Sequence, residues 1–403
     1  MNRLMNRSGV AAASALGLAL LSGFVAAPAR EADTPPHSAE DYAADAMALA
    51  GLIHDAYAYL DELPGGDVPS SAQLDAERDA VRDRDGLLHY AEDLIAALAD
   101  HHALTASSFR DDWAVVPSYS DIWITRSGDA YRVDAVKDDS IAAAAGIRSG
   151  DRLVQVDGQP IDTAVSSFWS RLGLTPDGER GPYAARVLAA GRRDRQRVLT
   201  FATPAGERTF TLDSLYAHQV DQPALTVEAT GGVTTIRFNN SIGEQSTIAA
   251  FDAEMAKLPP DSSVVIDLTD TPSGGNTTVA RAIMGWFVTR PMPYQMHQLP
   301  GEARATGIER RWVEYVLPRA GKYHPGPVQI RVGRWTGSMG EGLAVGFMAL
   351  GYPVCGTPMA GLKGAVYDLD LPNTGLGVKF PVEQLFTVDG TPRHHVVPEA
   401  CRP

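Results

Sequence analysis

The chain has little cysteine, a deficit of positive charge and almost no long apolar runs. Cys355 and Cys401 are its only cysteines, too few to suggest a zinc site. They could pair in an oxidising compartment, with two separate thiols as the alternative. The 35 basic residues against 49 acidic ones give a net charge of −14, which argues against nucleic acid and anionic membranes as partners.

Apolar runs of membrane-spanning length are absent beyond the N-terminal segment. Residues 1–29 combine Arg3 and Arg7 with an apolar stretch over 10–27 and a small-residue Ala-Pro-Ala end. This arrangement is typical of a secretory signal peptide, and an uncleaved N-terminal anchor is the alternative. We expect an exported, periplasmic or extracellular protein with no stable membrane insertion after signal removal.

Local patterns divide the remaining chain into three regions, and the 44% hydrophobic content is enough to give each a core. Region 38–105 begins with a capping pattern at Ser38 and carries helical apolar stripes. Region 113–220 consists of short strands and turns. Region 224–400 alternates strands with helices, which predicts a layered α/β domain with right-handed crossovers.

One stretch of the second region is highly specific. Residues 145–158 read A-G-I-R-S-G-D-R-L-V-Q-V-D-G, with a helix stop at Gly146, a tight turn at Gly150 and an Asp-Gly hairpin turn. This stretch resembles the PDZ domains of bacterial proteases. The resemblance implies a groove that binds an extended peptide at a sheet edge. No G-L-G-F carboxylate-binding loop is recognisable over 119–128, which leaves open whether free C-termini are bound.

A glycine-rich turn in the third region carries a candidate nucleophile. Ser338 lies in W-T-G-S-M-G-E-G, before an expected helix over 343–350, and Lys363 follows downstream. A serine hydroxyl needs a base, and a neutral lysine can serve as one. Ser338 and Glu341 also fit a capping box, a role confined to the helix start. The two roles are compatible, because a helix N-terminus stabilises an oxyanion.

The segment around Ser338 resembles the active site of the tail-specific, or C-terminal processing, serine peptidases. In these enzymes a serine lies three residues before a glutamate, as Ser338 lies before Glu341 here. A lysine follows the serine at the same interval as Lys363 follows Ser338. The resemblance implies an α/β core of crotonase-like type and hydrolysis of protein or peptide substrates recruited through the PDZ domain. It implies no metal and no cofactor.

The segment 267–276 resembles the D-L-R-x-N-x-G-G loop of the same family. By this resemblance, the oxyanion hole would consist of the backbone amides of Gly274 or Gly275 and of Met339, since glycines let a backbone approach a carbonyl closely. Two departures stand out: Thr269 replaces the arginine, and the loop is one residue longer.

Two residues compete for the role of base. Lys363 has the family spacing, but Tyr367 stands where those enzymes carry a glutamine that orients the lysine. A second branch, resembling the tricorn-type peptidases, uses a histidine before the PDZ domain, and Asp100 and His102 match its D-G-H-T motif. The C-terminal glutamate of that branch has no clear equivalent near 393–395. We place Lys363 first and His102 second.

Two other functions are compatible with parts of the sequence. The departures at Thr269 and Tyr367 leave open the alternative of a catalytically inactive scaffold that binds peptides through its PDZ domain. A metallohydrolase using the histidine pairs 101–102 and 394–395 is disfavoured, because no H-E-x-x-H or comparable ligand spacing is present.

Overall fold

The computed structural model of the protein describes residues 37–217 and 221–401. The signal peptide predicted at 1–29 lies outside the described residues. From His37 onward the chain forms one unit. Within the described ranges, no helix has the length and apolar character needed to cross a membrane.

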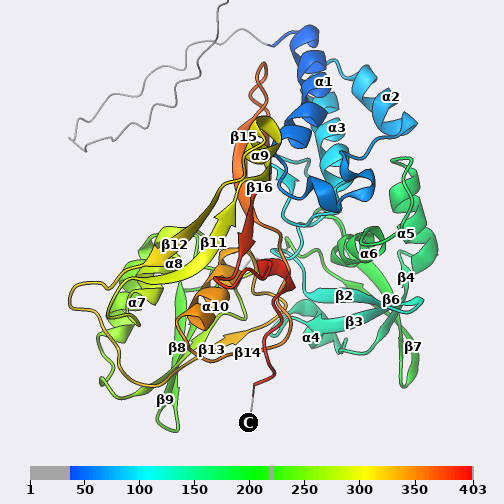
Figure 1. The fold of residues 1–403 in the computed structure, drawn as a ribbon. Coiled ribbons are helices and arrows are strands. Elements are labelled where there is room, and N and C mark those ends of the chain that lie inside the picture. Colours follow the sequence, from blue (N-terminus) through cyan, green and yellow to red (C-terminus); the bar gives the residue numbers. More distant parts are fainter. Residues whose placement is uncertain (1–36, 218–220, 402–403) are drawn as a thin grey trace, which may run out of the picture. The chain divides into compact units, whose positions relative to one another are not determined.

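Three helices pack together in the N-terminal region (Figure 1): α1 (Ala39–Ala56), α2 (Ala72–Ala80) and α3 (Arg84–Ala96). The capping pattern predicted at Ser38 is present, since Asp41 N–H donates to its hydroxyl at 3.2 Å. Helix α1 ends about a turn earlier than its apolar stripe predicts, because Ala58 N–H donates instead to Pro381 O at 2.8 Å. The short turns η1 (Leu60–Glu62) and η2 (Pro64–Gly66) follow.

The next region forms a sheet of order β2-β3-β4-β6-β7, with β5 paired to β4. The predicted strand, short helix and Asp-Gly turn are present, whereas α5 and α6 were not predicted. The strands are β2 (Ile122–Ser127), β3 (Ala130–Val136), β4 (Arg152–Val156), β5 (Gln159–Pro160), β6 (Arg197–Thr203) and β7 (Gly206–Leu212). The helices are α4 (Ile141–Ala145), α5 (Ile161–Ser170) and α6 (Arg180–Ala190).

The expected α/β layer is a sheet of order β14-β13-β10-β9-β8, parallel except for β8. Helix α10 starts four residues before the predicted helix, so Ser338 is its N-cap residue. The strands are β8 (Leu225–Thr230), β9 (Val233–Phe238), β10 (Ser263–Asp267), β13 (Val328–Val332) and β14 (Val354–Gly356). The helices are α7 (Ser246–Met255), α8 (Thr277–Met284) and α10 (Met339–Ala349).

A further antiparallel sheet, not predicted from the sequence, has the order β1-β16-β11-β12, with β15 paired to β16. Helix α10 packs against β11. The buried Asp45 carboxylate of α1 holds the β15–β16 turn by accepting hydrogen bonds from Asn373 and Thr374. The elements are β1 (Leu104–Thr105), β11 (Met292–Gln298), β12 (Arg311–Val316), β15 (Ala365–Asp370), β16 (Gly377–Phe386), α9 (Pro300–Thr306) and η3 (Arg393–His395).

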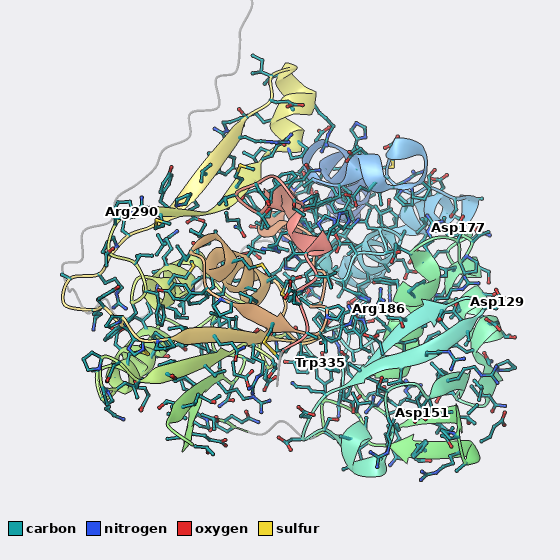
Figure 2. All side chains as sticks on the ribbon, turned by 60° about the horizontal axis from the view of Figure 1, so that its bottom comes forward. Asp129, Asp151, Asp177, Arg186, Arg290 and Trp335 are labelled. Carbon is teal, nitrogen blue, oxygen red and sulfur yellow. A yellow bond between two sulfur atoms is a disulfide. The ribbon has the colours of Figure 1, made fainter. Side chains whose placement is uncertain are left out.

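A small apolar cluster fixes the turn before α10 against the PDZ region. Trp335, labelled in Figure 2, is buried with Leu362 and with Trp123 of β2. Its indole N–H donates to Ser120 O at 2.7 Å, which satisfies its one polar atom. The position of the candidate nucleophile therefore depends on packing between regions distant in sequence.

Candidate active site

Ser338 occupies a strained turn at the start of α10. Its φ of 49° and ψ of −113° lie in a region that non-glycine residues rarely adopt. The neighbouring glycines allow the loop after β10 to approach closely. A Cβ at Gly337 would lie 2.6 Å from Pro272 O, and one at Gly340 would lie 2.4 Å from Thr271 Oγ1. The turn therefore requires these glycines.

Thr336 stands where the hydrolase elbow has its first glycine. It is fully buried, and its hydroxyl donates to Leu268 O at 2.8 Å and accepts from Gly333 N–H at 3.0 Å. Thr271 N–H also donates to Trp335 O at 2.9 Å. These bonds join the serine turn to the loop after β10.

That loop brings backbone amides beside Ser338. A Cβ at Gly274, whose φ is +66°, would lie 2.4 Å from Ser338 Cβ and 2.8 Å from Met339 N. The N–H of Gly274 donates to Thr271 O at 3.1 Å, whereas that of Gly275 donates to no group within 37–217 and 221–401. Met339 is the first residue of α10, so its N–H lacks an intrahelical acceptor. Gly275 and Met339 can thus offer two donors to an oxyanion.

The loop departures from the family pattern have local partners. Thr269, at the position of the family arginine, donates from its N–H and its hydroxyl to Asp267 Oδ1 at 2.9 and 2.6 Å. Asp270 forms an ion pair with Lys137 at 2.7 Å, from the segment that follows β3. The loop is therefore anchored to the PDZ region without the arginine.

Lys363, our first choice of base, has its side chain paired with a carboxylate of the N-terminal helical region. Its Nζ lies 2.6 Å from Glu62 Oε2 and 5.2 Å from the centre of the Tyr59 ring. The sequence interval to Ser338 did not reveal this, because the competing carboxylate comes from the distant η1 turn.

His102 has the geometry of a base. Its Nδ1 lies 2.5 Å from the main-chain oxygen of Lys363, and a carbonyl only accepts, so Nδ1 carries the proton and Nε2 keeps a free lone pair. Burial lowers the pKa of His102 to about 4, with Arg393 acting in the same direction. The imidazole is therefore neutral at neutral pH. Its backbone N–H donates to Asp100 Oδ1 at 2.9 Å, and that carboxylate also accepts from Tyr57.

A cavity of about 390 Å³ brings Ser338, His102, Gly275 and Met339 together. Lys363 is not among its lining residues. The polar residues that line it and that sequence reasoning missed include Gln295, His297 and Arg393. Alternation along β11 places Gln295 and His297 on one face, a signal that could have been found had the strand been recognised.

His297 is held between two carboxylates in this wall. Its Nδ1 lies 2.6 Å from Glu383 Oε2, and its Nε2 lies 3.3 Å from Glu314 Oε2. Burial opposes its charge, but the hydrogen bonds to Glu314 and Glu383 raise the pKa of His297 overall. Tyr367, at the position of the family glutamine, donates to Glu383 rather than to Lys363.

Glu341 links Ser338, the candidate nucleophile, to the loop that carries Lys363. Its fully buried carboxyl accepts from Ser338 N–H at 2.9 Å, Gly361 N–H at 2.9 Å and Leu362 N–H at 3.1 Å. Burial raises the pKa of Glu341 to about 7, against the opposing effect of Arg393. The predicted capping residue thus has a second role, bridging two loops.

The remaining candidates from the sequence are His101, which also lines the cavity, and the two cysteines. His101 accepts from Arg186 Nε at 2.8 Å, and Arg186, labelled in Figure 2, belongs to α6. Cys355 and Cys401 are joined by a disulfide that fastens the C-terminal segment beside β14. No group of three or more histidine, cysteine or acidic side chains in the described part of the chain is arranged to hold a metal ion.

Comparisons with known proteins agree with this architecture. A PDZ domain family model matches residues 132–167. The photosystem II D1 C-terminal processing protease is similar in structure with a TM-score of 0.54 and 16% identity, over 89% of this chain and 92% of that chain. Mature CPAF complexed with lactacystin gives a TM-score of 0.55 and 15% identity, over 90% and 93%. A search of curated proteins finds no match.

The chain therefore has a PDZ domain and the α/β fold of the PDZ-containing C-terminal processing peptidases. The family resemblance predicted from the sequence is confirmed at the level of fold.

Proposed function

We propose that the chain is an exported serine peptidase that hydrolyses peptide bonds in protein or peptide substrates recruited through its PDZ domain. One observation carries the proposal: Ser338, a neutral histidine and two available backbone amides line one cavity in a peptidase fold. In this proposal the helical region spans 38–105, the PDZ domain 113–220, and a crotonase-like catalytic domain 224–400.

The proposed reaction uses His102 as the base. Ser338 Oγ attacks the scissile carbonyl carbon while His102 Nε2 takes the hydroxyl proton. The Gly275 and Met339 amides stabilise the tetrahedral oxyanion. Collapse of the intermediate breaks the C–N bond, and the imidazolium returns its proton to the leaving amine. Water, activated by the same imidazole, then hydrolyses the acyl-enzyme.

Fluorophosphonate labelling together with hydrolysis of an unfolded casein tests the proposal. The wild-type protein should be labelled and should cleave casein, and Ser338→Ala should do neither. Ser118→Ala is a control, because that serine also lines the cavity, and its hydroxyl, which accepts from Ser273 at 3.0 Å, takes no part in the proposed reaction. Labelling that persists in Ser338→Ala would reject Ser338 as the nucleophile.

The second candidate function is a catalytically inactive scaffold that binds peptides. It is favoured by one observation: across the residues described, no hydrogen bond joins the Ser338 hydroxyl to His102. A protein that binds extended peptides in calorimetry, but neither reacts with fluorophosphonate nor cleaves casein, would support this candidate instead.

A further inference from the structure

The loop over residues 361–364, between β14 and β15, has its main chain hydrogen-bonded on both sides. Glu341 accepts from two of its N–H groups, as described above. Arg393, which is buried, donates from Nη2 to Leu362 O at 3.1 Å and to Gly364 O at 2.9 Å. The loop carbonyl between these two, that of Lys363, is the one that faces His102 Nδ1.

Gly364 sets the direction of that carbonyl. Its φ is +54°, and a Cβ there would lie 2.2 Å from Glu383 O and 2.9 Å from the Tyr59 ring. Only glycine fits a left-handed turn in so little space. The Lys-Gly pair thus turns the chain and presents the Lys363 carbonyl to the histidine.

The Lys363 side chain ties this loop to the region that carries the histidine. Glu62 lies on η1 and His102 follows α3, so both belong to the N-terminal helical region. The Lys363–Glu62 ion pair therefore spans the same two parts of the molecule as the hydrogen bond between the Lys363 carbonyl and His102. Lys363 thus contacts the N-terminal helical region twice, through its side chain and through its main-chain carbonyl.

We propose that Lys363 is a positioning residue: its main-chain carbonyl orients His102, and its ion pair with Glu62 keeps that carbonyl in place. The inference rests on the proposed function, because it assigns the group that orients the base of the same site. Here the orienting group is a main-chain carbonyl, where hydrolase triads commonly use a carboxylate. Like a carboxylate, the carbonyl accepts the Nδ1 proton of His102 and so leaves the lone pair of Nε2 unprotonated. Unlike a carboxylate, it carries no negative charge.

Three variants test the role of the side chain. Lys363→Met and Glu62→Gln each break the ion pair but leave the carbonyl, whereas Lys363→Arg keeps a cation for Glu62 and cannot act as a base. The pair is partly exposed, with 25% and 38% of the side chains accessible, so its loss should be modest. We expect kcat to fall about 3- to 10-fold in the first two variants with KM nearly unchanged, and Lys363→Arg to remain close to wild type.

A spectroscopic measurement separates this inference from the proposed function. Nitrogen NMR of ¹⁵N-histidine-labelled Ser338→Ala protein reports the His102 tautomer without any turnover, with the His102→Gln variant assigning the signal. Nδ1 should be protonated, and Lys363→Met and Glu62→Gln should each add a second tautomer. Lys257→Met, which removes a comparable 2.7 Å ion pair with Glu254 on α7, should change nothing.

Several results would overturn the inference. A folded but inactive Lys363→Arg would make Lys363 the base. An Nε2-protonated His102, or wild-type kcat and tautomer in both Lys363→Met and Glu62→Gln, would remove the positioning role. Should the wild-type protein hydrolyse nothing while the tautomer responds as expected, the proposed function alone would fail.

Discussion

Gly274→Ala is the substitution for which the structure makes the sharpest prediction. The added Cβ would lie 2.4 Å from Ser338 Cβ, 2.8 Å from Met339 N and 3.0 Å from Gly337 O. Two of these three atoms are backbone, so relief requires the nucleophile turn or the loop after β10 to move. The φ of +66° adds conformational strain for any residue with a Cβ.

The expected loss of stability has two parts. Placing an L-residue at this φ costs about 1–2 kcal/mol, and overpacking adds about 1–3 kcal/mol. The unfolding free energy should thus fall by about 2–5 kcal/mol in urea titrations, with an unchanged m-value. Activity should fall at least about 100-fold, because displacing Ser338 and the Met339 amide disturbs both attack and oxyanion binding.

Gly231→Ala is a matched control for the strain alone. Gly231 lies between β8 and β9 with a φ of +59° and has open space where a Cβ would stand. The Gly231→Ala variant should lose only about 1–2 kcal/mol of unfolding free energy and keep full activity. Gly274→Ala with kcat and labelling rate within about threefold of wild type would refute the reasoning, since a displaced oxyanion donor costs about 100-fold or more.

Three further outcomes follow from the site and the C-terminal segment. Ser338→Ala should abolish casein cleavage while lowering the unfolding free energy by only about 0.5–2 kcal/mol, and unchanged turnover would exclude it as the nucleophile. Replacing Cys355 and Cys401 by alanine should cost about 4 kcal/mol on the loop-entropy model for their sequence separation of 46, whereas free thiols in protein purified oxidised would contradict the disulfide. The base can be tested by pH: His102 must be neutral to accept a proton, and its pKa is lowered to about 4, so activity should rise with pH through about 4 and be flat at neutrality. A loss of activity confined to Lys363→Ala, with His102→Ala still active, would reverse the assignment.

The local elements follow from the sequence because short-range chemistry sets them. The capping hydroxyl at Ser38, the left-handed Gly146 that ends α4, and the Asp157-Gly158 turn with φ of 50° and 77° each depend on a few neighbouring residues. The same holds for the parallel strands with buried apolar runs such as β10. Ser338 at a helix start and the glycines of the facing loop belong to this class.

Tertiary structure alone decided which candidates meet. The spacing between Ser338 and Lys363 can be read from the sequence. The partner of the Lys363 side chain, Glu62 on the distant η1 turn, is set by the tertiary structure. The sheet carrying Gln295 and His297 was not predicted because β16 pairs with the distant strands β1 and β11, and because polar residues of β11 are buried. His102 acquires its tautomer from the carbonyl of Lys363, a contact between residues far apart in the chain. Sequence specifies the available side chains and their local turns, whereas burial and long-range pairing decide which of them line the cavity with Ser338.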